Sequence, residues 1–286
     1  MLRSANLTYF YVNNLKINCK MIPILSVFIT EVLWRDNMML NGKRIMVVGA
    51  SRGIGSAIAH GCALEGASVV LVGRNQNTLE EVASELKICN NAKVSTLVWD
   101  VSDVNKGPEI INSAAQALGG LDVIIHNAGV IDHEPLLHVT EKEWDKLFDI
   151  NVKGAYFCIQ AAINYYLEHN EINERGIRGK IVVVSSETGN QPHPKPYGVS
   201  KWAVMGMCKG FAKAFFKDGI VISNIAPGPT ATEMMRISER KDNSFPSAFT
   251  RMADPEEIAD LAVFLSSDKS NRIAGQPIYI NGGLNW

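Results

Sequence analysis

From residue 43 onward, short apolar segments alternate with amphipathic segments of ten or more residues. The first apolar segment, residues 43–49, is a continuous hydrophobic run closed by glycine, which is typical of a strand buried on both faces. Further strands are expected at residues 67–73, 93–99, 121–126, 180–186, 221–226 and 277–280, and helices at residues 53–65, 78–87, 109–118, 141–167, 197–216 and 255–265. Strands separated by such helices form βαβ units. We therefore predict one doubly wound α/β domain with a parallel sheet of about seven strands and helices on both faces.

Composition excludes several classes of protein. The 28 Lys+Arg against 29 Asp+Glu give a net charge of -1, which argues against a nucleic-acid partner. Five scattered cysteines without a C-x-x-C spacing fit neither a disulfide framework nor a zinc site, and no other cluster suggests a metal. The scattered cysteines favour a reducing compartment, so we expect a cytoplasmic protein. The longest apolar run before residue 43, residues 21–30, is about half of a membrane span, and we expect none.

Residues 1–38 lack the alternation that begins at residue 43, and we interpret them as an N-terminal extension of unknown role. They are either a misassigned start or a targeting segment. A mitochondrial address is the weaker alternative, because Arg3, Lys16 and Lys20 precede any acidic residue but arginine is sparse. The catalytic domain is then residues 39–286.

A glycine-rich loop, Gly49-Ala50-Ser51-Arg52-Gly53-Ile54-Gly55, lies between the first predicted strand and the first predicted helix. Its first glycine permits a tight turn, and the other two let backbone and helix approach a pyrophosphate. The helix N-terminus adds free N–H groups and a positive dipole end. This placement predicts a Rossmann-type dinucleotide site, rather than a loop that merely turns, with Gly49, Ser51, Arg52, Gly53, Ile54 and Gly55 as binding residues.

The end of the second predicted strand indicates which dinucleotide binds. An acidic residue about twenty positions after the loop usually binds the ribose 2′-hydroxyl. Gly73 occupies that position, and Arg74 comes next. Arg52 and Arg74 can instead clamp a 2′-phosphate with charge-assisted hydrogen bonds, so we predict NADP(H) in preference to NAD(H). Either arginine alone would more often be a solvated surface residue.

Further motifs occur in a fixed order along the chain. They are Asp100-Val101, His126-Asn127-Ala128-Gly129, Asn151 in Asn151-Val152-Lys153-Gly154, Ser185-Ser186, Tyr197-Gly198-Val199-Ser200-Lys201 and Pro227-Gly228-Pro229-Thr230-Ala231-Thr232. Y-x-x-x-K alone is a common accident, but the whole set in this order resembles the short-chain dehydrogenase/reductase family in its compact single-domain branch. The resemblance covers residues 43–286 and implies an oxidoreductase. It also implies coenzyme contacts from Asp100, Val101, Asn127, Ala128, Gly129, Tyr197, Lys201, Pro227, Gly228, Thr230 and Thr232.

The chemistry of such a reaction requires a proton donor or acceptor at the substrate oxygen. A tyrosine with a pKa near ~10 is a weak base at neutral pH. Lys201 lies one helical turn after Tyr197, so its ammonium can stabilise the phenolate. Ser186, at the end of a predicted strand, can hydrogen-bond the substrate oxygen as charge develops.

The resemblance also bears on the roles of a serine and an asparagine. Its x-x-G pattern after the serine favours Ser186 over Ser185 as the functional hydroxyl. It implies that Asn151 anchors a water linking Lys201 to solvent, although Asn151 could simply cap or kink its helix. With these roles filled, the mechanism leaves no place for a histidine, and we expect His126, His133 and His138 to be ordinary surface or loop residues.

We expect the substrate to be a small carbonyl or alcohol compound. Residues 187–196 and 231–251 should shape its pocket, and the second segment has the composition of a lid with an apolar inner face. Similarity within the family is to 3-oxoacyl-thioester reductases and the glucose/ribitol dehydrogenase group. The first class needs basic residues near the cleft, for which Arg175, Arg178 and Lys180 are candidates. A sugar or polyol dehydrogenase is the alternative, and a non-catalytic nucleotide-binding sensor is another. The segment 273–283 resembles a subunit-packing segment, which favours a homo-oligomer, a homotetramer or homodimer.

Overall fold

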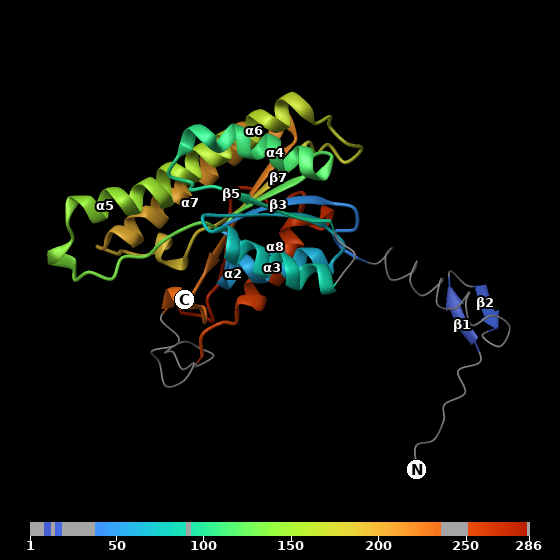
Figure 1. Cartoon of the computed structure of the whole chain (residues 1–286), viewed down its shortest axis with the longest axis horizontal. Coiled ribbons are helices and arrows are strands. Elements are labelled where there is room, and N and C mark those ends of the chain that lie inside the picture. Colours follow the sequence, from blue (N-terminus) through green and yellow to red (C-terminus); the bar gives the residue numbers. More distant parts are fainter. Residues whose placement is uncertain (1–8, 13–14, 19–37, 90–92, 236–250, 285–286) are drawn as a thin grey trace, which may run out of the picture.

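A computed structural model describes residues 9–12, 15–18, 38–89, 93–235 and 251–284. Its centre is a seven-stranded sheet in the order β5-β4-β3-β6-β7-β8-β9 (Figure 1). Every neighbouring pair is parallel. The strands are β3 (Arg44–Val48), β4 (Ser68–Gly73), β5 (Val94–Val98), β6 (Val123–His126), β7 (Gly179–Val184), β8 (Ile220–Pro227) and β9 (Pro277–Ile280). The predicted doubly wound α/β fold is confirmed.

Helices cover both faces of this sheet. They are α2 (Gly53–Leu64), α3 (Gln76–Cys89), α4 (Gly107–Leu118), α5 (Glu141–Phe148), α6 (Ala155–His169), α7 (Pro196–Phe215) and α8 (Pro255–Ser266). α4, α6 and α7 pack on one face and α2, α3 and α8 on the other (Figure 1). Short 3-10 turns lie at Val104–Lys106, Leu136–His138, Glu187–Asn190, Phe216–Asp218, Glu233–Met235 and Asp268–Ser270.

The apolar runs in the sequence exist because the central strands are buried on both faces. In β3, Met46 and Val48 face the α4, α6 and α7 layer, while Ile45 and Val47 face the α2 and α8 layer. Every residue of β7 and β8 is buried. The strand order reverses between β3 and β6, so a crevice opens beyond their carboxyl ends, where ligands bind in such sheets.

The long helix expected at residues 141–167 is interrupted. α5 and α6 are joined by a π-helical segment, Asp149–Gly154, whose wider turn changes the direction in which the following side chains point. Asn151 lies in this segment and hydrogen-bonds a neighbouring loop, while a Cβ on Gly154 would lie 2.9 Å from the carbonyl oxygen of Val101. Apolar periodicity carries no signal for such tertiary contacts, so the sequence predicted a regular helix.

Two strands in the N-terminal extension were not expected. β1 (Tyr9–Val12) and β2 (Leu15–Asn18) pair antiparallel in a sheet of their own. The remainder of residues 1–37 lies outside the described residues. Within the described part of the chain, none of the helices combines the length and the apolar character that a membrane crossing requires.

Candidate active site

The glycine-rich loop packs against the segment that follows β6. The backbone at Gly49 has φ +84°, and a Cβ there would lie 2.7 Å from the backbone nitrogen of Ala128. A Cβ on Gly55 would overlap the carbonyl oxygen of Gly49, which also accepts a hydrogen bond from the Asn127 amide at 3.1 Å. Glycine is therefore required at both positions, and the structure brings the loop and the Asn127-Ala128-Gly129 motif together.

The first turn of α2 is suited to an anion. Arg52 at its N-cap gives no side-chain hydrogen bond to the turn, and α2 has no acidic residue there. The orphan N–H groups of a helix start and its positive dipole end favour a phosphate at this position. Ser51 and Ile54 are half-buried within the same loop.

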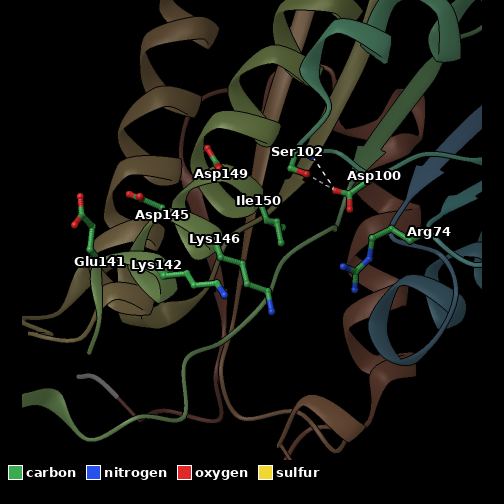
Figure 2. Close-up of a pocket in the computed structure, with 9 residues that line it drawn as sticks. All are labelled: Arg74, Asp100, Ser102, Glu141, Lys142, Asp145, Lys146, Asp149 and Ile150. Carbon is green, nitrogen blue, oxygen red and sulfur yellow. Dashed lines mark hydrogen bonds between the residues drawn. The ribbon is translucent and has the colours of Figure 1, made fainter. Parts of the chain in front are cut away.

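A cleft of about 540 Å³ opens beyond the carboxyl ends of β4 and β5. Figure 2 shows Arg74 on one wall, Asp100 and Ser102 above it, and helix α5 opposite. Ser102 donates to the Asp100 carboxylate from its hydroxyl at 2.7 Å and from its backbone at 3.0 Å. Partial burial opposes the charge on Asp100, but these hydrogen bonds and the nearby Arg74 lower its pKa.

Two lysines of α5 also line this cleft. The ammonium groups of Lys142 and Lys146 point toward the side on which Arg74 lies, while the carboxylates of Glu141, Asp145 and Asp149 point away (Figure 2). Sequence reasoning missed both lysines, because the acidic residues at 141–145 read as an ordinary solvated first turn. Their i, i+4 spacing was the available signal, since it places both on one helix face.

Arg52 does not share the cleft with Arg74. Its guanidinium pairs with the Glu233 carboxylate at 2.5 Å, and both side chains are largely exposed. The glycine-rich loop also approaches the loop after β8 at Gly53, where a Cβ would lie 3.1 Å from the Thr232 methyl group. The predicted pair of phosphate-clamping arginines is thus split between the cleft and the loop after β8.

The loop after β8 carries the other predicted coenzyme residues. Thr230 is buried, and its hydroxyl donates to the Gly228 carbonyl at 3.0 Å. Thr232 donates to the Thr230 carbonyl at 3.4 Å. Pro227 ends β8 and is buried, so the motif leaves the sheet beside the glycine loop.

Ser185 and Ser186 have different partners. The Ser185 hydroxyl is 2.6 Å from Asn224 Oδ1 and donates to the Ile225 carbonyl at 3.0 Å, so it joins β7 to β8 inside the sheet. Ser186 lies beyond the strand, accepts from the Thr188 hydroxyl at 3.0 Å, and hydrogen-bonds Tyr197. Ser186 is thus the serine on the tyrosine side.

Tyr197 and Lys201 are on one face of α7, with the Lys201 Nζ 5.5 Å from the centre of the Tyr197 ring. Lys201 is buried, and its ammonium donates to the Val184 carbonyl at 3.4 Å. Burial lowers the pKa of Lys201 to about 8. Burial raises the pKa of Tyr197, against the hydrogen bond from Ser186, and the carboxylates of Glu187 and Asp132 raise it further.

Asn151 reaches the same group from the π-helical segment. Its amide oxygen accepts from the Val130 N–H at 2.8 Å, and its amide nitrogen donates to the Val130 carbonyl at 2.9 Å and to the Ser200 hydroxyl at 3.1 Å. A Cβ on Gly129 would lie 3.3 Å from Asn151 Oδ1 and 3.4 Å from Lys201 Nζ. The side chains of Asn151 and Lys201 therefore meet at Gly129.

His126 is not a surface or loop residue, as the sequence suggested, although His133 and His138 are exposed. It is the last residue of β6, it is 2% exposed, and neither ring nitrogen has a hydrogen-bond partner among the described residues. Burial, and then the charge of Lys201, lower its pKa to about 3. The preceding apolar run already placed residue 126 in a strand, and its position beside the coenzyme motif led us to expect a loop.

The basic residues considered for binding a 3-oxoacyl-thioester substrate lie at the other edge of the sheet from the site. Arg175, Arg178 and Lys180 precede or begin β7, whereas Ser186 lies beyond its carboxyl end. Lys180 is buried, and its ammonium donates to the Ser270 hydroxyl at 2.7 Å and contacts the Ser267 carbonyl at 2.5 Å.

The two predicted substrate segments are described to different extents. Glu187 is buried and accepts from the Asn281 amide at 3.3 Å, which makes one wall polar. Most of the expected lid, residues 236–250, lies outside the described residues. Among the residues that the structure does describe, no three His, Cys, Asp or Glu side chains gather in a way that could hold a metal ion.

Comparison with known proteins agrees with this geometry. A family model described as enoyl-(acyl carrier protein) reductase matches residues 49–285. Gluconate 5-dehydrogenase of Gluconobacter oxydans is 35% identical over 256 residues, which are 87% of this chain and 97% of that protein. The 3-oxoacyl-(acyl-carrier-protein) reductase FabG of Thermotoga maritima is 32% identical over 252 residues, 86% of this chain and 99% of that protein.

A solved structure shares the fold. The short-chain dehydrogenase of Burkholderia cenocepacia, crystallised in complex with NADP, superimposes with a TM-score of 0.75 and 26% sequence identity. The match covers 86% of this chain and 98% of that one. The fold, the order of the motifs and the geometry of the site therefore all agree with those of these dehydrogenases and reductases.

Proposed function

The chain belongs to the short-chain dehydrogenase/reductase family, and from that premise we propose that it is an NADP(H)-dependent oxidoreductase that interconverts a carbonyl and a secondary alcohol. One observation carries the proposal. Ser186, Tyr197, Lys201 and Asn151 converge from separate segments at the carboxyl end of the sheet, beside the glycine-rich loop. In this proposal residues 39–286 form the catalytic domain.

The residues around the loop fit a dinucleotide. Gly49 and Gly55 leave the space that a Cβ would fill, and the first turn of α2 offers N–H groups to the pyrophosphate. We assign the adenosine end to the cleft lined by Arg74 and Asp100, with Val101 next in the chain, and the nicotinamide end to the motifs at residues 127–129 and 227–232. When bound, the coenzyme supplies or accepts the hydride at the substrate carbon.

The side chains of this site can move the accompanying proton. In the reducing direction the Tyr197 hydroxyl donates its proton to the carbonyl oxygen, while Ser186 stabilises the charge that develops on that oxygen. The Lys201 ammonium stabilises the phenolate that remains on Tyr197. Asn151, held by Val130 and next to Lys201, completes the path along which the proton is replaced.

The preference for NADP(H) is supported by charge. Arg74, Lys142 and Lys146 present three cationic groups around the cleft, and the acidic residue expected in NAD-binding relatives of this fold is replaced by Gly73 (Figure 2). A 2′-phosphate carries the negative charge that such a cluster recognises. The Burkholderia cenocepacia structure, which contains NADP, supports the same choice.

Two substrate classes remain within this reaction type. A 3-oxoacyl thioester is supported by the similarity to FabG and by the family model. A sugar or polyol is supported by the 35% identity to gluconate 5-dehydrogenase and by the hydrogen-bonded polar pair of buried Glu187 and half-buried Asn281 near Ser186. Carboxylate and amide groups accept and donate the hydrogen bonds that substrate hydroxyls require.

The deciding experiment is NADPH and NADH oxidation by the wild type and by Tyr197→Phe, with 3-oxoacyl thioesters, polyhydroxy ketones and small diketones as acceptors. We expect turnover that Tyr197→Phe abolishes, and the preferred acceptor assigns the class. Tight nucleotide binding without turnover on any acceptor would instead favour the nucleotide sensor.

We also propose a cytoplasmic homo-oligomer, a tetramer or dimer. Cys62, Cys158 and Cys208 are free and buried, which suits a reducing compartment. α6 and α7 leave five large apolar side chains exposed, namely Tyr156, Phe157, Leu167, Val199 and Trp202. Exposed apolar side chains of this kind are what contact between subunits would cover. A monomeric mass by light scattering at micromolar concentration would contradict the oligomer.

A further inference from the structure

The helix that carries Tyr197 and Lys201 does not cap its own start. Lys195, at the N-cap of α7, gives no side-chain hydrogen bond to the first turn. The first N–H groups of a helix have no partner within the helix and need one elsewhere. Pro196 has no N–H group, so Tyr197 carries the first backbone donor of α7.

Asp132 supplies the missing acceptor from a distant segment. Its Oδ2 accepts the Tyr197 backbone N–H at 2.8 Å, across 65 residues of sequence. Its Oδ1 has no hydrogen bond among the described residues, but the Lys195 ammonium lies 3.5 Å away. The Asp132 side chain is only 8% exposed, so the carboxylate is nearly enclosed at the positive end of the α7 dipole.

The placement of Asp132 joins two parts of the site. It lies three residues after Gly129, in the loop that leaves β6 after the Asn127-Ala128-Gly129 motif. Val130 in the same loop holds Asn151. One short loop therefore fixes both the residue that neighbours Lys201 and the backbone of Tyr197.

The groups that face Tyr197 come from three elements. Asp132 approaches from the loop after β6, and Ser186 with Glu187 from the turn after β7. Lys201 approaches along α7 itself, and Lys195 forms an ion pair with Asp132. Burial is the main cause that raises the pKa of Tyr197, and the charges of Glu187 and Asp132 add to it.

We propose that Asp132 is a positioning residue for Tyr197, which anchors the start of α7 and presents a negative charge that disfavours the phenolate. The inference rests on the proposed role of Tyr197 as proton donor. The charge of Asp132 affects which direction of the reaction the site favours. A Tyr197 hydroxyl that stays protonated to higher pH remains a proton donor over a wider pH range. Asp132 therefore adapts the site to carbonyl reduction.

Tyr197 can be titrated in the free protein, without substrate or coenzyme. Carbon-13 NMR of labelled tyrosine follows the phenol, and the resonance of Tyr197 is assigned as the one lost in Tyr197→Phe. Asp132→Asn keeps a hydrogen-bond acceptor and removes the charge, so we expect Tyr197 to titrate at lower pH than in the wild type. Lys195→Met removes the cation that offsets Asp132, so we expect Tyr197 to titrate at higher pH. Asp218→Asn, which removes an exposed carboxylate from the turn after α7, is the matched control and leaves the titration unchanged.

Kinetics separate position from charge. Asp132→Ala loses the acceptor as well as the charge, and we expect kcat for carbonyl reduction to fall about 10- to 100-fold, because small displacements of a reacting group are costly. Asp132→Asn retains most of kcat, while the alkaline limb of the reduction profile moves to lower pH.

Loss of the fold cannot shift the titration of Tyr197 to lower pH in Asp132→Asn and to higher pH in Lys195→Met. Unchanged titration of Tyr197 in both variants would overturn the proposal, and if Asp132→Asn does not fold, Lys195→Met alone decides it. A protein that reduces no carbonyl, but in which Tyr197 shows these shifts, would refute the proposed function and leave the electrostatic role of Asp132 intact.

Discussion

The proposed coenzyme end of this site and its proposed proton-transfer group are built in different ways. Around the glycine-rich loop, the groups that matter are backbone atoms, and the requirement is that Gly49 and Gly55 have no Cβ. In the proton-transfer group that we propose, the reacting atoms are on side chains of Ser186, Tyr197 and Lys201. These are brought together by contacts between segments far apart in the sequence, such as Asp132 with Tyr197.

This difference predicts two kinds of failure. A backbone cradle fails when atoms are added to it, because a Cβ forces chain segments apart. A side-chain group fails when atoms are removed, because the scaffold remains and the chemistry is lost. Variants at each end should therefore separate nucleotide affinity from turnover.

The largest effect is expected for Lys201→Met. The variant removes the charge that stabilises the Tyr197 phenolate, and we expect kcat to fall about 10²- to 10⁴-fold. Nucleotide affinity, measured by quenching of protein fluorescence, should fall much less, since the glycine-rich loop is intact. Lys209→Met, at an exposed position of the same helix, serves as control and should keep wild-type turnover. Equal losses of affinity and kcat in Lys201→Met would remove the distinction between the two ends.

Gly55→Ala should produce the opposite pattern. The added Cβ overlaps the carbonyl oxygen of Gly49, so the loop must shift, and strain of about 2–3 kcal/mol corresponds to a loss of nucleotide affinity of about 30- to 150-fold. Isothermal titration with NADPH measures it. Gly206→Ala is the matched control, because a Cβ there meets no atom within 4 Å and should stabilise α7 by about 0.5–1 kcal/mol. Wild-type affinity in Gly55→Ala would show that the loop is not a cradle.

Arg74→Asp tests the adenosine end, where side chains add to the backbone site. The change removes a cation from the cleft and introduces an anion, so we expect NADPH affinity to fall about tenfold or more while NADH affinity is retained. Lys146→Gln should act in the same direction with a smaller effect, and Arg175→Gln at the other edge of the sheet should have none. An unchanged ratio of NADPH to NADH affinity in Arg74→Asp would refute the clamp.

The sequence predicts features that depend on local residue pattern better than features that depend on contacts between distant segments. Strand positions and the glycine-rich loop are set by local residue pattern, because a buried parallel strand is apolar throughout and a tight turn needs glycine. The fold and the loop were therefore predictable. Helical spacing alone pairs Tyr197 with Lys201, but the grouping of Ser186 and Asn151 with them was accessible only through the resemblance, because it depends on where distant segments meet.

The features that sequence reasoning missed are tertiary in origin. Asp132 is unremarkable in the sequence, and its role depends on the start of α7 lying within hydrogen-bond distance. The π-helical segment depends on contacts of Asn151 and Gly154 with other loops. The ion pair of Arg52 with Glu233 also joins segments that no local pattern connects, while the predicted contact of Arg52 with a phosphate stays a prediction.

The smallest predicted effect lies where the two ends meet, at His126. The pKa of this buried imidazole is lowered from 6.5 to about 3, so between these values the unfolded chain binds a proton that the folded protein does not. Stability contributed by the neutral imidazole is therefore present above pH 6.5 and declines as the pH falls below it. From about pH 7.5 to about pH 5.5 the wild type should lose about 1.4 kcal/mol more than His126→Asn, measured by urea unfolding at both values. Any cavity left by asparagine is independent of pH and cancels in this difference, and His133→Asn, at an exposed position, should behave like the wild type. Identical pH dependence in His126→Asn and the wild type would mean that the imidazole acquires its proton inside the fold, beside Lys201, and that the boundary between the two ends is open to water.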